Sequence, residues 1–187
     1  MESDARRWDE KYRKGKLEAL KAEPLLTQHR ERIRSLSGSR TALDVAAGRC
    51  HAGVYLATQG LTVTALDCSP VGLDLGLALA TQEGVQIKTR VTDLETEPLP
   101  EGPWSLISCF RYLNRELFGP MKAVLEPAGL LFFSTFNRHH LENAPRFNPS
   151  YVLAPGELEE TFGSLEILEL SDGHDPSESA SWVVARR

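Results

Sequence analysis

The fold of this chain is decided by residues 41–67, TALDVAAGRCHAGVYLATQGLTVTALD. A short apolar run leads into a turn of small residues, an apolar helix follows, and an alternating strand ends at Asp67. Small residues let the backbone turn tightly, so a nucleotide-like ligand can approach the turn closely. Asp67 follows Gly48 by about twenty residues, a distance that suits an acid accepting hydrogen bonds from ribose hydroxyls. The stretch therefore predicts a strand, turn, helix and strand that together bind such a ligand.

The composition is that of an ordinary folded protein. The chain has 187 residues, 41% of them apolar, which is enough to bury a core without disulfides or metals. A formal net charge of -5 disfavours nucleic acid as a partner. The charged N-terminus lacks a signal-like apolar segment and no apolar run approaches the roughly 20 residues of a membrane span. We expect a cytoplasmic monomer with no membrane contact, whose Cys50, Cys68 and Cys109 are reduced thiols.

Strands and helices alternate along the chain, which favours a parallel sheet covered on both faces. The last two strands, at 165–170 and 181–185, are joined by a segment too short for a crossover helix and should pair antiparallel. The other strands are predicted at 42–46, 61–66, 85–91, 104–110 and 130–136, and the helices after the opening unit at 70–83, 116–125 and 155–162. The expected fold is a Rossmann-like, doubly wound α/β sheet of about seven strands, mostly parallel with the last antiparallel.

One domain is expected, in three parts. Residues 1–38 form a helical cap, with Trp8 and Tyr12 on one face of a first helix and a second helix over 25–36. Residues 39–136 form the ligand-binding core. Residues 137–187 hold a loop at 137–151 that folds over the carboxyl ends of the strands, then a short helix and the antiparallel strand pair.

Three carboxylates fall at successive strand ends, on the edge where open α/β sheets bind ligands. Asp67 would face a ribose, Asp93 an adenine amino group, and Asp44 an ammonium group or the glycine turn. Such an edge suits a ligand rich in hydrogen-bond donors and suits a triphosphate badly.

These residues resemble the class I S-adenosylmethionine-dependent methyltransferases, whose first motif is an acid followed by small residues and glycines at every second position. Asp44, Ala46 and Gly48 match that motif. The bacterial tellurite-resistance-type and thiopurine-type small-molecule enzymes are the more similar members, because residues 8–12 read WDEKY. The resemblance implies S-adenosylmethionine as cofactor and methyl transfer to a small molecule. It covers residues 8–136 and extends more weakly into the tail.

The resemblance also implies a set of site residues. The cofactor-binding residues would be Trp8, Tyr12, Asp44, Ala46, Gly48, Cys50, Asp67, Cys68, Asp93, Leu94 and Phe110. No catalytic residue is assigned, and the substrate-side candidates by position are Tyr112, Asn137, His139 and His140. The chain departs from the family pattern at Ala46 and Cys50, which predicts a tighter-packed turn and weaker cofactor binding. Ala128 also stands where the family often has glycine, in the turn before the fifth strand, and weakens that part of the match.

Several alternatives remain open from the residues alone. Trp8 and Tyr12 either anchor the first helix on the core or form a lid over the site. Phe110 and Tyr112 either pack in the core or line the site. Arg111 and Arg115 either bind an acidic acceptor or lie in solvent at the start of a helix. A nicotinamide or flavin site lacks its middle glycine, and the cysteines match no common zinc pattern, so no metal is expected. A non-catalytic protein that senses S-adenosylmethionine or S-adenosylhomocysteine is the second functional hypothesis.

Overall fold

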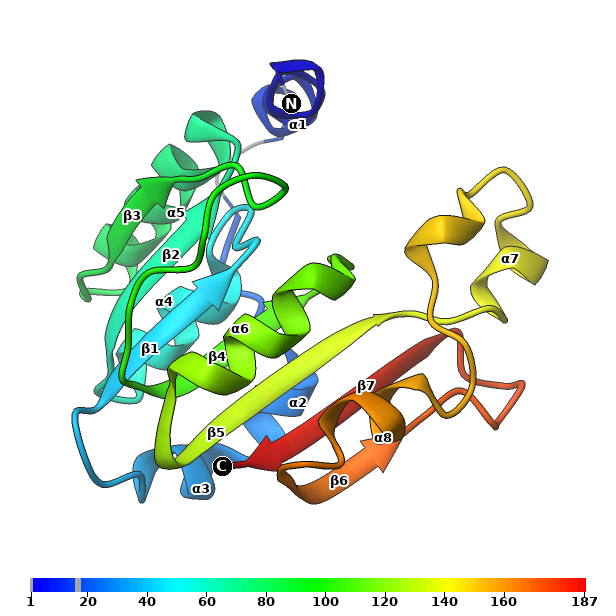
Figure 1. Ribbon diagram of the computed structural model, residues 1–187. Helices are drawn as coiled ribbons and strands as arrows, with labels where there is room; N and C mark the ends of the chain where they lie inside the picture. Colours follow the sequence, from blue (N-terminus) through cyan, green and yellow to red (C-terminus); the bar gives the residue numbers. More distant parts are fainter. Residues whose placement is uncertain (1, 16–17) are drawn as a thin grey trace.

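The computed structural model describes residues 2–15 and 18–187. A twisted sheet crosses the molecule with helices on both of its faces (Figure 1). Its strands are β1 (Thr41–Val45), β2 (Thr62–Asp67), β3 (Lys88–Val91), β4 (Trp104–Phe110), β5 (Leu125–Phe136), β6 (Glu166–Ser171) and β7 (Ala180–Arg186). The helices are α1 (Glu2–Arg13), α2 (Pro24–Gln28), α3 (Arg30–Arg34), α4 (His51–Thr58), α5 (Pro70–Gln82), α6 (Phe118–Val124), α7 (His140–Asn143) and α8 (Glu157–Phe162), with 3₁₀ turns η1 (Arg115–Leu117) and η2 (Pro149–Tyr151).

The strand order confirms the predicted fold class. Seven strands of the described chain form one sheet in the order β3-β2-β1-β4-β5-β7-β6. All neighbouring pairs from β3 to β5 are parallel, whereas β7 runs antiparallel between β5 and β6. The order reverses between β1 and β4, so the carboxyl ends of these two strands mark the switch point where such sheets bind ligands.

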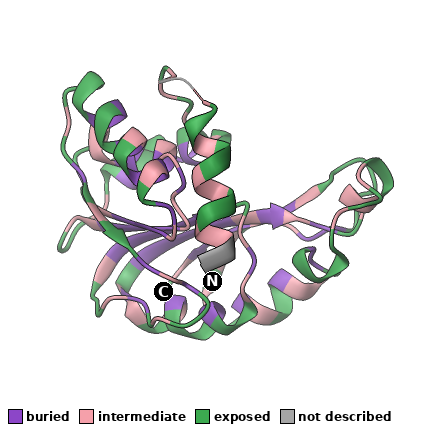
Figure 2. Cartoon of the chain, turned by 90° about the horizontal axis from the view of Figure 1, so that it is seen from above, coloured by how far each residue is buried: buried purple, intermediate pink, exposed green. Residues whose placement is uncertain are grey.

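The core forms two layers because side chains alternate between the faces of each strand. On one face, residues such as Leu106 and Phe132 pack against α2 to α5. On the other, their sequence neighbours Ile107 and Phe133 pack against α6 and α8. All four side chains are fully buried or nearly so, and Figure 2 shows the buried strands enclosed by partly exposed helices. This double cover explains why the central strands are continuously apolar.

The N-terminal cap differs from its prediction. The second helix is broken into α2 and α3 at His29, whose side chain is 4% exposed and packs edge-on against Phe132 with ring centroids 5.6 Å apart. Burying this polar residue between the helices interrupts the helical repeat that the leucines had suggested. Residues 1, 16 and 17 of the predicted cap lie outside the described residues.

Two boundaries in the core were also predicted wrongly. β3 begins at Lys88 because the amide of Val85 still bonds the carbonyl of Ala80, which keeps residue 85 in the turn that ends α5. The break expected at residues 126–129 lies inside β5, as an irregularity in its pairing with β4. Ala128 there has a left-handed φ of 64°. The start of α5 is as predicted, since the Ser69 side chain caps it by accepting the amide of Gly72.

The segment expected to fold over the strand ends instead extends past them. It leaves β5 at Asn137, forms α7 and η2, and returns at Leu153, which forms an isolated bridge with Asn137. Figure 1 shows α7 projecting beyond the ends of β5 and β7, well to one side of β1 and β2. The segment has its own small core, in which His140 stacks on Phe136 at 3.9 Å and meets Phe147 edge-on at 5.0 Å. Because Phe136 is the last residue of β5, these aromatic contacts pack the segment against the end of that strand.

Across residues 2–15 and 18–187, the helices are all too short or too polar to cross a membrane.

Candidate functional site

The turn between β1 and α4 is the centre of the candidate site. Ala46, Gly48 and Cys50 adopt left-handed φ angles of 55°, 55° and 57°. This conformation costs a non-glycine residue roughly 1–2 kcal/mol, and strained residues of this kind cluster at functional sites. Ala46 and Cys50 thus carry a backbone conformation that favours glycine, and the turn is strained at both residues.

The Cys50 side chain is directed into the core. It is fully buried, and burial raises the pKa of its thiol well above the ordinary value. A Cβ placed on Gly76 of α5 would overlap the Cys50 sulfur, so the glycine makes room for the thiol. Only the backbone of Cys50 is therefore available to line a ligand site.

Asp67 ties the turn to the end of β2. Its two carboxylate oxygens accept the amide of Gly48 at 2.7 Å and the amide of Ser69 at 2.8 Å. The residue is 7% exposed, and burial raises the pKa of its carboxyl even though these hydrogen bonds oppose the shift. Next to it, burial and the neighbouring Asp67 raise the pKa of Cys68 to about 11. Asp67 holds the turn in place from the edge where a ligand hydroxyl would arrive.

Asp44 lies deeper than the sequence suggested. It is 1% exposed, and its oxygens accept the amide of Gly53 in α4 at 2.8 Å and the hydroxyl of Ser108 in β4 at 2.9 Å. Burial, assisted by the charge of Asp67, raises the pKa of Asp44 to about 7. Of its two expected orientations, the structure shows the one toward the turn and its helix. Asp44 thereby joins β1, α4 and β4 beneath the site.

Helix α1 covers the turn from outside. Trp8 and Tyr12 stack with centroids 5.6 Å apart, and a Cβ on Gly48 would lie 2.7 Å from the Tyr12 hydroxyl oxygen. Gly72 leaves space for the Tyr12 ring, which would be 2.9 Å from a Cβ there. Asp9 fastens the helix by accepting the Ser69 hydroxyl at 2.5 Å. Tyr12 therefore packs on both the turn and α5, with Trp8 stacked on it, an arrangement that fits the anchor and the lid alternatives alike.

The turns after β3 and β4 form a second wall. Asp93 accepts the amide of Glu95 and so shapes its own turn, and Leu94 is 6% exposed. Tyr112 donates its hydroxyl to Glu95 at 2.8 Å, and Asn114 donates to the carbonyl of Leu94 at 3.0 Å. The side chains of Tyr112 and Asn114 therefore join the turn after β4 to the turn after β3.

Two of the predicted site residues on these turns are committed to the fold. Phe110, at the end of β4, is 9% exposed and packs in the core, which favours its structural reading. Burial and the hydrogen bond to Glu95 raise the pKa of Tyr112 well above its ordinary value, so its hydroxyl keeps its proton at neutral pH.

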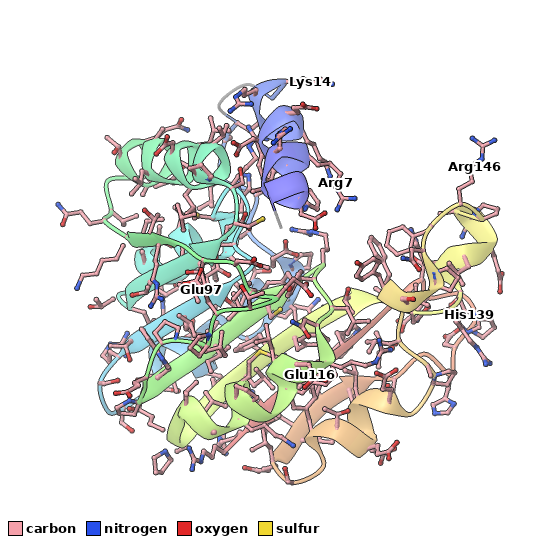
Figure 3. All side chains as sticks on the ribbon, turned by 45° about the horizontal axis from the view of Figure 1, so that its top comes forward. Arg7, Lys14, Glu97, Glu116, His139 and Arg146 are labelled. Atoms are coloured by element: carbon pink, nitrogen blue, oxygen red, sulfur yellow. The ribbon has the colours of Figure 1, made fainter. Side chains whose placement is uncertain are left out.

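The remaining substrate-side candidates lie on or beside the projecting segment. Asn137 is fully buried, donates to the carbonyl of Glu178 and accepts the amide of His139. The His139 ring lies 3.1 Å from the carbonyl of Gly173, and His140 is stacked on aromatic rings. Figure 3 shows His139 on the opposite side of the molecule from Glu97, whose turn carries Asp93. The structure does not bring the two histidines together with Asp67 and the glycine turn.

The sequence singles out Arg111 and Arg115 as candidates for the site but does not indicate their partners. Arg111 bonds Glu23, 88 residues earlier, at 2.5 Å, and Arg115 bonds Glu157, 42 residues later, at 2.6 Å. Neither pairing has a local signal in the sequence, because the partners meet only when the sheet has formed. Both arginines are therefore held by carboxylates of the chain itself.

The described residues contain no group of three His, Cys, Asp or Glu side chains placed to hold a metal ion. The chemistry of the edge does fit S-adenosylmethionine. Asp44 and Asp67 are buried acids whose raised pKa values reflect desolvation, and their hydrogen-bond partners in the described chain are backbone amides, the Ser108 hydroxyl and the Cys68 thiol. A ligand with hydroxyl donors and a positive centre would compensate these carboxylates.

Comparisons with known proteins agree with this geometry. Residues 42–129 match the family model described as a methyltransferase domain. The ubiquinone biosynthesis O-methyltransferase of Xylella fastidiosa (strain M23) is 33% identical over 111 residues, which are 56% of this chain and 44% of that protein. The chain thus spans about half the length of the curated relatives that it matches.

Solved structures share the fold at lower sequence identity. TehB from Haemophilus influenzae superposes with a TM-score of 0.66 and 20% identity, over 79% of this chain and 57% of that one. A SAM-dependent methyltransferase from Aquifex aeolicus gives a TM-score of 0.60 and 15% identity, over 98% and 97%. By its glycine turn, its strand-end acids and its sheet order, the chain is similar to the class I S-adenosylmethionine-dependent methyltransferases, and residues 42–129 match a methyltransferase domain.

Proposed function

We propose that the protein is an enzyme that transfers a methyl group from S-adenosylmethionine to a small-molecule acceptor. One observation carries the proposal: the glycine turn, held by Asp67 and covered by Tyr12, lies at the sheet's switch point. The curated relatives are methyltransferases of ubiquinone biosynthesis, which supports a small acceptor here.

The chain's own residues would hold the cofactor in three ways. Asp67 has a carboxylate at the end of β2 that would accept ribose hydroxyls. Asp93 and Leu94 would border the adenine. Trp8, four residues before Tyr12 on the same helix, would cover the ligand and exclude water. When bound, S-adenosylmethionine supplies an electrophilic methyl group on a sulfonium sulfur.

The acceptor side carries little general-base chemistry near the turn. Tyr112 retains its proton, and Asn137 is buried and hydrogen-bonded. His139 and His140 are engaged on the projecting segment, and His51, next to the turn, accepts the amide of Lys21 through Nδ1. A soft nucleophile that ionises by itself, such as a thiol, needs no base from the protein, and the chain's contribution is then alignment of the two reactants. We therefore favour a thiol or another soft nucleophile as acceptor.

Calorimetry with S-adenosylmethionine and S-adenosylhomocysteine tests cofactor binding, with Asp74→Ala, an exposed carboxylate of α5, as the control for surface charge. Turnover against thiols, selenite, tellurite and small acids, measured as S-adenosylhomocysteine formed, tests the enzyme. Absence of binding at about 1 mM ligand would contradict the proposal. Binding without turnover across the panel would favour the sensor instead.

The proposal extends to one domain that works as a cytoplasmic monomer without nucleic acid. The net charge of -5 and the free thiols of Cys50, Cys68 and Cys109 support it. Light scattering of the purified protein measures the oligomeric state.

A further inference from the structure

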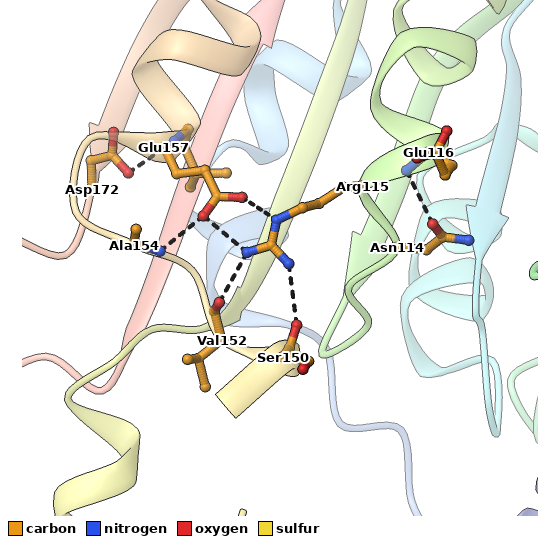
Figure 4. A network of polar contacts seen from close by, with 9 residues as sticks. Asn114, Arg115, Glu116, Ser150, Val152, Ala154, Glu157 and Asp172 are labelled. Atoms are coloured by element: carbon orange, nitrogen blue, oxygen red, sulfur yellow. Dashed lines mark hydrogen bonds and ion pairs between the residues drawn. The ribbon is translucent and has the colours of Figure 1, made fainter. Parts of the chain in front are cut away.

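Arg115 joins the loop after β4 to residues 150–157, at the base of the projecting segment. Its guanidinium bonds both carboxylate oxygens of Glu157, at 2.6 and 3.0 Å, and donates to the carbonyls of Ser150 and Val152, each at 3.1 Å. Glu157 in turn accepts the amide of Ala154 at 2.9 Å. Figure 4 shows this network closing around residues 150–157. A planar guanidinium can make such a two-pronged contact, whereas a lysine cannot.

The same short loop is bonded to residues 93–97, the turn after β3 that would border the adenine and that we call the cofactor wall. Tyr112 reaches Glu95, and Asn114 reaches the carbonyl of Leu94, in the turn that follows β3. The Asn114 side chain also accepts the amide of Glu116 and so caps η1, the 3₁₀ turn that carries Arg115. Residues 112–115 therefore connect the adenine-side turn with residues 150–157.

The network also holds the base of the projecting segment. Residues 138–152 leave and return through a narrow neck, where Leu153 donates its amide to Phe136 and Arg138 donates its amide to Leu153. Arg115 donates to the carbonyls of Ser150 and Val152, where the chain returns to this neck just before Leu153. The orientation of the projecting segment relative to the cofactor wall thus depends on Arg115, together with the neck and the contact of His139 with the Gly173 carbonyl.

We propose that Arg115 is a positioning residue for methyl transfer: it sets the projecting segment 138–152 as the acceptor-side wall at a fixed orientation to the cofactor wall. The inference rests on the proposed function. Methyl transfer requires nucleophile, carbon and leaving sulfur in line, and a shift of about 1 Å can lower the rate about 100-fold. Loss of a residue that aligns the two walls should lower kcat/KM for the acceptor and leave the affinity for the cofactor unchanged.

The test compares wild type with Arg115→Ala, Arg115→Lys and the control Lys122→Met. Lys122 also links α6 to α8, by donating to the carbonyl of Thr161 at 2.8 Å, but makes no contact with residues 150–157. One measurement is hydrogen exchange in residues 138–153. The others are S-adenosylhomocysteine affinity by calorimetry, and KM and kcat for the panel compound with the highest turnover.

For Arg115→Ala we expect faster exchange across 138–153, a cofactor Kd within about twofold of wild type, and acceptor kcat/KM lower by about 10–100-fold. Arg115→Lys should recover part of each effect, and Lys122→Met should change only thermal stability. Unchanged exchange in 138–153, or an equal loss in cofactor affinity, would overturn the positioning role. If the wild type binds no cofactor, the proposed function fails, and the exchange data still decide whether Arg115 holds the segment.

Discussion

The sulfur of Cys50 fills the space that a side chain at residue 76 would need. Cys50 stands in the turn before α4, and Gly76 faces it from the middle of α5. The missing side chain at residue 76 therefore leaves the space that the Cys50 thiol occupies.

Gly76→Ala should therefore destabilise the protein by about 1–3 kcal/mol, because its Cβ would overlap the buried sulfur. The double variant with Cys50→Gly should recover most of that loss, since the space is then free. Gly119→Ala in α6 is the matched control: nothing lies within 4 Å of its Cβ position, and helix propensity predicts a gain of up to about 1 kcal/mol. Urea unfolding measures all three, and a double variant no more stable than Gly76→Ala would disprove the pairing.

Ala128→Gly should raise the free energy of unfolding by about 0.5–1 kcal/mol. Ala128 is exposed and has a φ of 64°, so glycine relieves strain without removing packing. Ala78→Gly, at an exposed position inside α5, should lower stability by about 1 kcal/mol. The two changes differ only in backbone conformation, and equal signs in thermal unfolding would contradict the explanation.

Asp44 should make stability depend on pH. Its pKa of about 7 in the fold lies above the value of about 3.9 expected for the unfolded chain, so the protonated acid favours folding. This stabilisation is complete below about pH 4 and is lost as pH rises through 7. Between pH 4 and 8, the free energy of unfolding of Asp44→Asn should fall by roughly 2–4 kcal/mol less than that of the wild type, as measured by urea unfolding. Asp74→Asn should show the same decline in the free energy of unfolding as the wild type. A decline that persists in Asp44→Asn would assign it to other groups.

Asp67→Ala should weaken S-adenosylhomocysteine binding by about 1–3 kcal/mol, through loss of charge-assisted hydrogen bonds. The variant should also lose stability, because the amides of Gly48 and Ser69 lose their acceptor. Asp67→Asn keeps an acceptor oxygen, so it should retain more stability than affinity. Calorimetry beside thermal unfolding separates the two effects, and unchanged affinity in a folded variant would remove Asp67 from the site.

The sequence by itself determined the sheet and the position of its edge. Apolar runs, the small-residue turn and Ser69 before Pro70 are local signals, and they predicted the strands, the start of α5 and the acids at the strand ends. Such signals work because periodicity, turn geometry and helix capping act over only a few residues.

Only the tertiary structure decided where the charged side chains are directed. Asp44 meets Ser108 from 64 residues away, Arg111 meets Glu23, and Arg115 meets Glu157. It also decided how residues 138–152 project from the sheet, because His140 and Phe147 pack on each other and on Phe136 at the end of β5. Contacts between residues so far apart in the sequence form only when the sheet and helices pack together. The residues next to each partner in the chain therefore do not indicate which side chain it will meet.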